Sequence, residues 1–171
     1  MEYALHITGL EELSRWDSRF SRVYVGSEFC SKLMFSLPEL REVISFVRSR
    51  KMGLSIATSY CNENNLSAYK AIIDFVGKNY SEAEFIVNDW GVFNICVASS
   101  VKTVIGRLLV KQKRDPRIFD ALNDFSSEAR LRSRDIGLND SILNFLKSKN
   151  IKRIELNNVL QGVDLENIKE H

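Results

Sequence analysis

Polar side chains at the ends of strand-like segments are the residues of this sequence best placed to carry chemistry. The acid and amide residues that we select among them are Glu28, Asn88, Asp89 and Glu155. A carboxylate directly after a strand can act as a general base, ligate a metal or cap the following helix. We therefore predict Asp89 and Glu155 as catalytic residues, with helix capping as the alternative for Asp89. Glu28 and Asn88 are predicted to bind ligand.

An arginine within an apolar segment is a further candidate. Arg107 lies in "VIGRLLV", and a buried guanidinium needs an anionic partner because an unpaired buried charge is costly. The partner is either an acid of the chain, such as Asp89 or Glu155, or the carboxylate or phosphate of a ligand. Lys111 and Arg114 follow in the basic stretch "KQKRDPR", and we predict them as further ligand-binding residues.

The positive charge of the chain is concentrated in one region. Basic residues outnumber acidic ones between Val101 and Arg134, although the net charge of the chain is only +2. Such a region can attract RNA, a phosphorylated ligand or an acidic partner. No aromatic interleaving or nucleic-acid motif accompanies it, so a solvated, salt-bridged surface is favoured over RNA binding.

Several common site types are excluded by the sequence. It contains no GxGxxG, GxxxxGK[ST] or GxSxG motif, which argues against nucleotide-binding loops and a nucleophile elbow. The two histidines, His6 and His171, lie at the ends of the chain, so we predict no metal site. The three cysteines, Cys30, Cys61 and Cys96, are odd in number and widely spaced, which favours free thiols in a reducing cytoplasm. The sequence does not identify a cofactor.

Alternating strand-like and helix-like segments must position these side chains. The predicted strands are Tyr3–Thr8, Arg22–Gly26, Leu54–Ser59, Glu84–Asn88, Thr103–Val110 and Ile151–Asn157. The predicted helices are Leu10–Arg15, a helix capped by Ser36 that ends near Met52, Ser67–Gly77, Trp90–Ala98 and one from Asn139 or Asp140 to Lys149. Strands that alternate with helices pair in parallel.

The length of the chain limits the architecture. A closed β/α barrel takes at least about 200 residues, whereas this chain has 171, so the sheet is either open and doubly wound or a barrel fragment. A fragment leaves an exposed strand edge, which predicts a second copy or a partner subunit. We expect one domain over residues 1–171. No apolar run approaches the roughly 20 residues of a membrane span, and Met1–Leu10 does not resemble a signal peptide.

The segments also resemble a known family. "RVYVGSEFCSKLMF", "FIVNDWGVF", "TVIGRLLVKQKRDPRI" and "IKRIELNNVLQG" are similar, in this order, to segments of the U32 peptidase-like proteins, and the resemblance covers roughly residues 3 to 163. It implies a β/α-barrel-like catalytic region. Some relatives are collagenase-type peptidases, and others act in RNA or quinone hydroxylation with an iron–sulfur cluster. The matching residues that can line a site are Glu28, Asn88, Asp89, Arg107 and Glu155.

Together these patterns predict an α/β fold, an incomplete TIM-barrel-like domain with about six parallel strands. The first functional hypothesis is a U32 peptidase-like domain, related to hydrolases, that binds a small or peptide-like anionic ligand at the strand carboxyl ends. The second is a non-catalytic assembly subunit whose open edge is completed by a partner or a second copy. The third is an RNA-binding accessory that uses residues 111–117.

Overall fold

A computed structural model describes residues 2–110, 112–113 and 115–165 of the chain. The chain groups into two compact units, Met1–Val104 and Ile105–His171, and each unit is described by itself. Unit 1 contains nearly all of the sheet, whereas unit 2 contains three short helices and extended segments. This grouping does not test the expectation of one domain over residues 1–171, which stays a prediction.

Five strands form one sheet in the order β1-β2-β3-β4-β5, so neighbours in the sequence are neighbours in the sheet. The strands are β1 (Ala4–Ile7), β2 (Arg22–Gly26), β3 (Gly53–Ala57), β4 (Glu84–Val87) and β5 (Lys102–Ile105). The first three neighbouring pairs are parallel, with Tyr24 opposite both His6 and Ser55. The prediction of an α/β fold with parallel strands is confirmed.

The prediction of six strands is wrong. Within 151–157 only Ile154 is bridged, to Ile105 of β5, through hydrogen bonds that involve the backbones of Arg153 and Glu155. β5 is also shorter than predicted, because it stops at Ile105 and a turn closed by Leu109 N–H on the Gly106 carbonyl follows. A longer ladder needs consecutive partners on both strands, and β5 offers none beyond Ile105.

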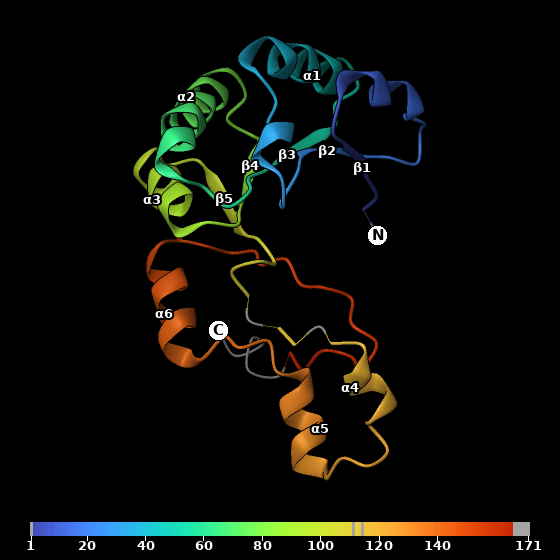
Figure 1. Cartoon of the computed structure of the whole chain (residues 1–171). Helices are drawn as coiled ribbons and strands as arrows, with labels where there is room; N and C mark the ends of the chain where they lie inside the picture. The colour runs from blue at the N-terminus through green and yellow to red at the C-terminus, as the bar shows by residue number, and fades with distance from the viewer. Residues whose placement is uncertain (1, 111, 114, 166–171) are drawn as a thin grey trace. The chain divides into compact units, whose positions relative to one another are not determined.

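The helices of unit 1 cover one face of the sheet. They are α1 (Leu37–Ser49), α2 (Glu63–Asn79) and α3 (Trp90–Ala98), and Figure 1 shows them along the same side of the strands. Alternate strand residues are buried on that side: Leu5, Ile7, Val23, Val25, Leu54, Ile56, Phe85 and Val87. The alternate positions on the other face include polar side chains of His6, Arg22, Tyr24, Ser55 and Glu84.

Local capping explains where the helices begin. The predicted capping box of α1 is present, because Ser36 accepts from the backbone of Glu39 while the Glu39 carboxylate accepts from the backbone of Ser36. α2 begins four residues before the predicted Ser67. Asn62 Oδ1 accepts from Asn65 N–H, so part of the polar stretch expected to be a loop forms the first helical turn.

Two shorter 3-10 helices complete unit 1: η1 (Leu10–Arg15), as predicted, and η2 (Ser31–Leu33). In unit 2 the helices are α4 (Arg117–Asp120), α5 (Ser127–Arg134) and α6 (Asp140–Ser148). α6 was predicted with its cap, since Asn139 Oδ1 accepts from Ile142 N–H and Leu143 and Leu146 are buried. Among the described residues, no helix combines the length and apolar character that crossing a membrane requires.

Gly26, the last residue of β2, gives the first testable prediction. Its φ is +94°, and a Cβ added there would lie 2.7 Å from the backbone carbonyl oxygen of Ala57. We expect Gly26→Ala to lower the free energy of unfolding by about 2 kcal/mol, because strain and overlap add. The matched control is Gly162→Ala, where φ is +80° but the atom nearest to an added Cβ is 3.9 Å away. There we expect the free energy of unfolding to fall by about 1 kcal/mol. Equal losses in urea denaturation of the two variants would contradict a close approach at Gly26.

Candidate functional site

The carboxyl edge of the sheet in unit 1 brings together His6, Tyr24 and Glu28. The His6 and Tyr24 rings meet edge to face with centroids 5.3 Å apart, as expected for opposite residues on β1 and β2. His6 Nε2 lies 2.8 Å from the Gly26 carbonyl oxygen, and Tyr24 Oη donates to Glu28 Oε1 at 3.4 Å. A carbonyl only accepts, so Nε2 donates and the Nδ1 of neutral His6 is left as an acceptor. An imidazole and a carboxylate at one edge can exchange protons with a ligand.

Asn88 holds two strand ends together. It is fully buried at 0% exposure, and its Nδ2 donates to the Thr58 carbonyl oxygen at 2.9 Å. Its backbone N–H donates to Thr58 Oγ1, which in turn donates to the Ile86 carbonyl oxygen. The buried amide is therefore engaged in fixing β3 to β4, and ligand binding by Asn88 stays a prediction.

Asp89 caps α3. Its Oδ1 accepts from the backbone N–H groups of Gly91 at 2.7 Å and Val92 at 3.2 Å. Its Oδ2 accepts from Cys61 N–H at 3.4 Å, which ties the loops after β3 and β4. Burial and the nearby Asp89 charge raise the pKa of the Cys61 thiol. This geometry agrees with the capping alternative for Asp89, and its catalytic role stays a prediction.

In unit 2, Arg107 lies two residues beyond the end of β5. Its Nη1 donates to Asn157 Oδ1 at 3.0 Å. The Asn157 backbone is held by Gln112, whose Oε1 accepts from Asn157 N–H at 2.8 Å and whose Nε2 donates to the Asn157 carbonyl at 3.1 Å. Glu155 lies nearby in the sequence, half-buried, with its N–H donating to the Ile105 carbonyl. The predicted ligand-binding residues Lys111 and Arg114 lie outside the described residues.

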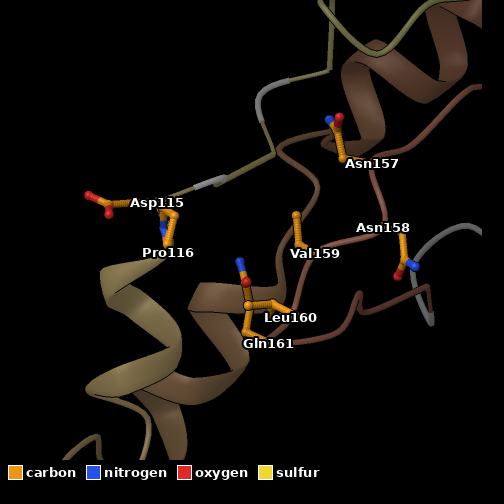
Figure 2. Close-up of a pocket in the computed structure, with 7 residues that line it drawn as sticks. All are labelled: Asp115, Pro116, Asn157, Asn158, Val159, Leu160 and Gln161. Carbon is orange, nitrogen blue, oxygen red and sulfur yellow. The ribbon is translucent and has the colours of Figure 1, made fainter.

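A cavity of about 230 Å³ adjoins this network within unit 2. Its walls are Asp115, Pro116, Asn157, Asn158, Val159, Leu160 and Gln161, and Figure 2 shows that they come from two segments of the chain. Gln161 fixes one wall, because its Nε2 donates to the Lys113 carbonyl and its own carbonyl accepts from Arg134 Nε. Hydrogen bonds from Arg117 lower the Asp115 pKa to about 2, so the carboxylate at this wall is paired with a guanidinium.

Sequence reasoning missed the pairings across the polar face of the sheet. Arg22 donates from Nη1 to Ser55 Oγ and to Glu84 Oε2, both at 3.1 Å. The partners of His6, which are Tyr24 and the Gly26 carbonyl, are also distant from it in the sequence. Period-two alternation within β1 and β2 was the available signal, since it places His6, Arg22 and Tyr24 on one face.

No group of three or more histidine, cysteine, aspartate or glutamate side chains within the described parts of the chain is arranged to hold a metal ion. Comparisons of the chain with protein-family models, with curated proteins and with solved structures find no match. The function must therefore be inferred from the placement of the chain's own residues.

Two substitutions at Asp89 separate capping from charge. We expect Asp89→Ala to lower the free energy of unfolding by about 1 kcal/mol, because the first N–H groups of α3 lose their acceptor. Asp89→Asn keeps an acceptor oxygen and should cost only a few tenths of a kcal/mol. Both values can be read from urea denaturation. If the asparagine variant loses as much as the alanine variant, the carboxylate charge and the contact of its second oxygen with Cys61 N–H matter more than the cap.

Thiol reactivity gives a further prediction. Burial raises the pKa of Cys96 to about 12, whereas Cys30 and Cys61 are partly exposed. At pH 8 we expect iodoacetamide to modify Cys30 and Cys61 in the folded chain and to leave Cys96 unmodified, because the thiolate is the reactive form. Asp89→Asn should speed the modification of Cys61 by removing a nearby negative charge. Mass spectrometry of the digested protein measures each site, and equal labelling of Cys96 and Cys61 would contradict this placement.

Proposed function

We propose that this chain is an incomplete β/α-barrel-type domain, similar to U32 peptidase-like proteins, that binds a small or peptide-like anionic ligand at its strand carboxyl ends. The observation that carries the proposal is the sequential order of the strands, with α1, α2 and α3 on one side of the sheet. Doubly wound sheets reverse their strand order and carry helices on both faces, whereas barrel strands follow sequence order with helices outside.

The polar face of the sheet supports the same proposal. In a barrel the face away from the helices lies inside, where polar side chains need partners. Arg22 meets Glu84 and Ser55 on this face, and Ser55 is only 1% exposed. Towards the carboxyl edge, where barrel ligands bind, the same face carries His6 on β1 and Tyr24 on β2, whereas β3 and β4 end there in Ala57 and Ile86.

Arg107 is the residue we propose to receive the anionic group. A guanidinium has five N–H donors in a planar fork that suits carboxylates and phosphates. Its contact with Asn157 Oδ1 fixes the orientation of the fork in unit 2, beside the cavity that Asn157 also lines. Lys111 and Arg114 are proposed to add positive charge.

For a hydrolytic reaction we propose Glu155, in preference to Asp89, as the general acid or base. Both oxygens of Asp89 already accept backbone N–H groups at the start of α3 and at Cys61. Oxygens that are engaged with the backbone in this way are less available to a ligand. Glu28, which accepts from Tyr24 in unit 1, is proposed as a ligand-binding group there.

The second candidate function is that of an assembly subunit. β1 lies at the end of the sheet, is four residues long and carries the exposed residues Ala4 and His6. An exposed strand edge is a template for pairing with another chain. The partner is a second copy or another subunit.

Ligand titrations followed by amide NMR test the ligand-binding proposal. The probes are acetyl-glycyl-glutamate and inorganic phosphate. We expect saturable shifts around Arg107, just beyond the carboxyl end of β5, and about a tenfold loss of affinity in Arg107→Gln, because one charged hydrogen-bonding partner is removed. Arg19→Gln is the matched control, since Arg19 is exposed and pairs with Asp17.

Thermal unfolding of both variants shows whether they fold. The proposal fails if neither probe gives saturable shifts, or if the shifts gather around Gly53 and Glu84 at the opposite edge. Absence of binding together with a dimeric mass in light scattering would favour the assembly subunit.

A further inference from the structure

Three exposed aromatic side chains occupy equivalent positions after neighbouring strands. Phe29, Tyr60 and Trp90 are each the third residue beyond the end of β2, β3 and β4. Their exposed fractions are 68%, 60% and 45%. We call these three residues the aromatic rim.

Strand register places the aromatic rim at one level of unit 1. Gly26 lies opposite Ala57, and Ala57 lies opposite Ile86, so the three strands end within one residue of each other. Neighbouring strands lie about 4.8 Å apart, so the ends of the three strands that lead to the rim span about 10 Å. This length suits several consecutive side chains of an extended segment.

The backbone under each rim residue is fixed by local contacts. Phe29 N–H donates to Ser27 Oγ at 3.3 Å, and the residue before Tyr60, Ser59, is bonded to Tyr69 Oη through both its N–H and its hydroxyl. Trp90 begins α3 and meets the buried ring of Phe93 edge to face at 5.3 Å. A binding surface held in place before contact loses less entropy when a partner arrives.

The charge around the aromatic rim selects the class of partner. The segments 27–33, 58–66 and 88–91, which include the first residues of α2 and α3, contain the acids Glu28, Glu63 and Asp89, against a single basic residue, Lys32. This balance repels the phosphates of a nucleic acid. It attracts cations, which the faces of aromatic rings also attract.

We propose that the aromatic rim binds a basic peptide segment, with lysine or arginine side chains lying over the rings of Phe29, Tyr60 and Trp90. Glu63 is exposed in the first turn of α2, three residues after Tyr60, and its carboxylate supplies negative charge for the basic side chains. This inference concerns a cationic partner after β2, β3 and β4, whereas the anionic group is proposed to bind Arg107, beyond the end of β5.

Intrinsic fluorescence tests the proposal, because the chain has only two tryptophans. The buried indole N–H of Trp16 has no hydrogen-bond partner among the described residues, so Trp16→Phe breaks no such bond and makes Trp90 the sole reporter. We expect a peptide of alternating arginine and glycine to change Trp90 emission saturably. A glutamate–glycine peptide of the same length should leave the emission unchanged.

Variants in the Trp16→Phe background locate the binding. Phe29→Ala and Tyr60→Ala should each weaken the arginine–glycine peptide about tenfold, whereas Tyr60→Phe should bind normally because the ring face is kept. Glu63→Gln should weaken binding less than the alanine variants do. Its effect should be larger at low salt than at high salt, because salt screens the charge that is removed. Phe119→Ala is the matched control, since Phe119 is an exposed phenylalanine of unit 2.

Four outcomes would overturn the proposal. The first is no saturable response to the basic peptide, and the second is that folded Phe29→Ala and Tyr60→Ala variants, checked by circular dichroism, bind it as tightly as the Trp16→Phe parent does. The third and fourth are that an oligouridylate or maltohexaose binds more tightly than the basic peptide. Arg107→Gln should leave the affinity for the basic peptide unchanged, which separates this inference from the ligand-binding proposal.

Discussion

Parallel pairing between consecutive strands is the constraint on which the rest of unit 1 depends. Two parallel neighbours cannot be joined by a tight hairpin, so each needs a crossover, and α1, α2 and α3 supply the crossovers from β2 to β5. Right-handed crossovers in one direction place these helices on the same face. The buried stripes of α1 and α2, for example Leu40 and Ile73, therefore meet one apolar face of the sheet. All carboxyl ends then lie at one edge.

This arrangement makes two demands on the residues at the carboxyl edge. Each following helix exposes N–H groups that need acceptors, and each strand end has backbone groups to satisfy. Asp89 and Asn62 meet the first demand for α3 and α2, and Asn88 with Thr58 meets the second. Polar residues at this edge are thus partly explained by folding alone. His6 also meets the second demand, because its Nε2 donates to the Gly26 carbonyl oxygen at the end of β2.

The sequence predicts elements well where the deciding interaction is local. The box of Ser36 and Glu39 and the cap at Asn139 each act within three residues, and both helices begin where their caps indicate. The prediction of a sixth strand is wrong because pairing along 151–157 depends on how far β5 extends, and a turn at Gly106 ends β5. The contact between His6 and Tyr24 spans two strands, so only the register reveals it.

The aromatic rim does not follow from folding in the way that the caps do. Burying a phenylalanine or tryptophan stabilises a protein by removing a large apolar area from water, and Phe85 and Phe93 fill the core beside these same loops. An aromatic ring that stays largely exposed gives little of that stabilisation, and a polar residue would serve a loop equally well. One such residue needs no explanation, since single exposed apolar residues are common. Three at the same position after successive strands, on backbones fixed by hydrogen bonds and among acids, form a surface whose chemistry is better explained by recognition than by stability.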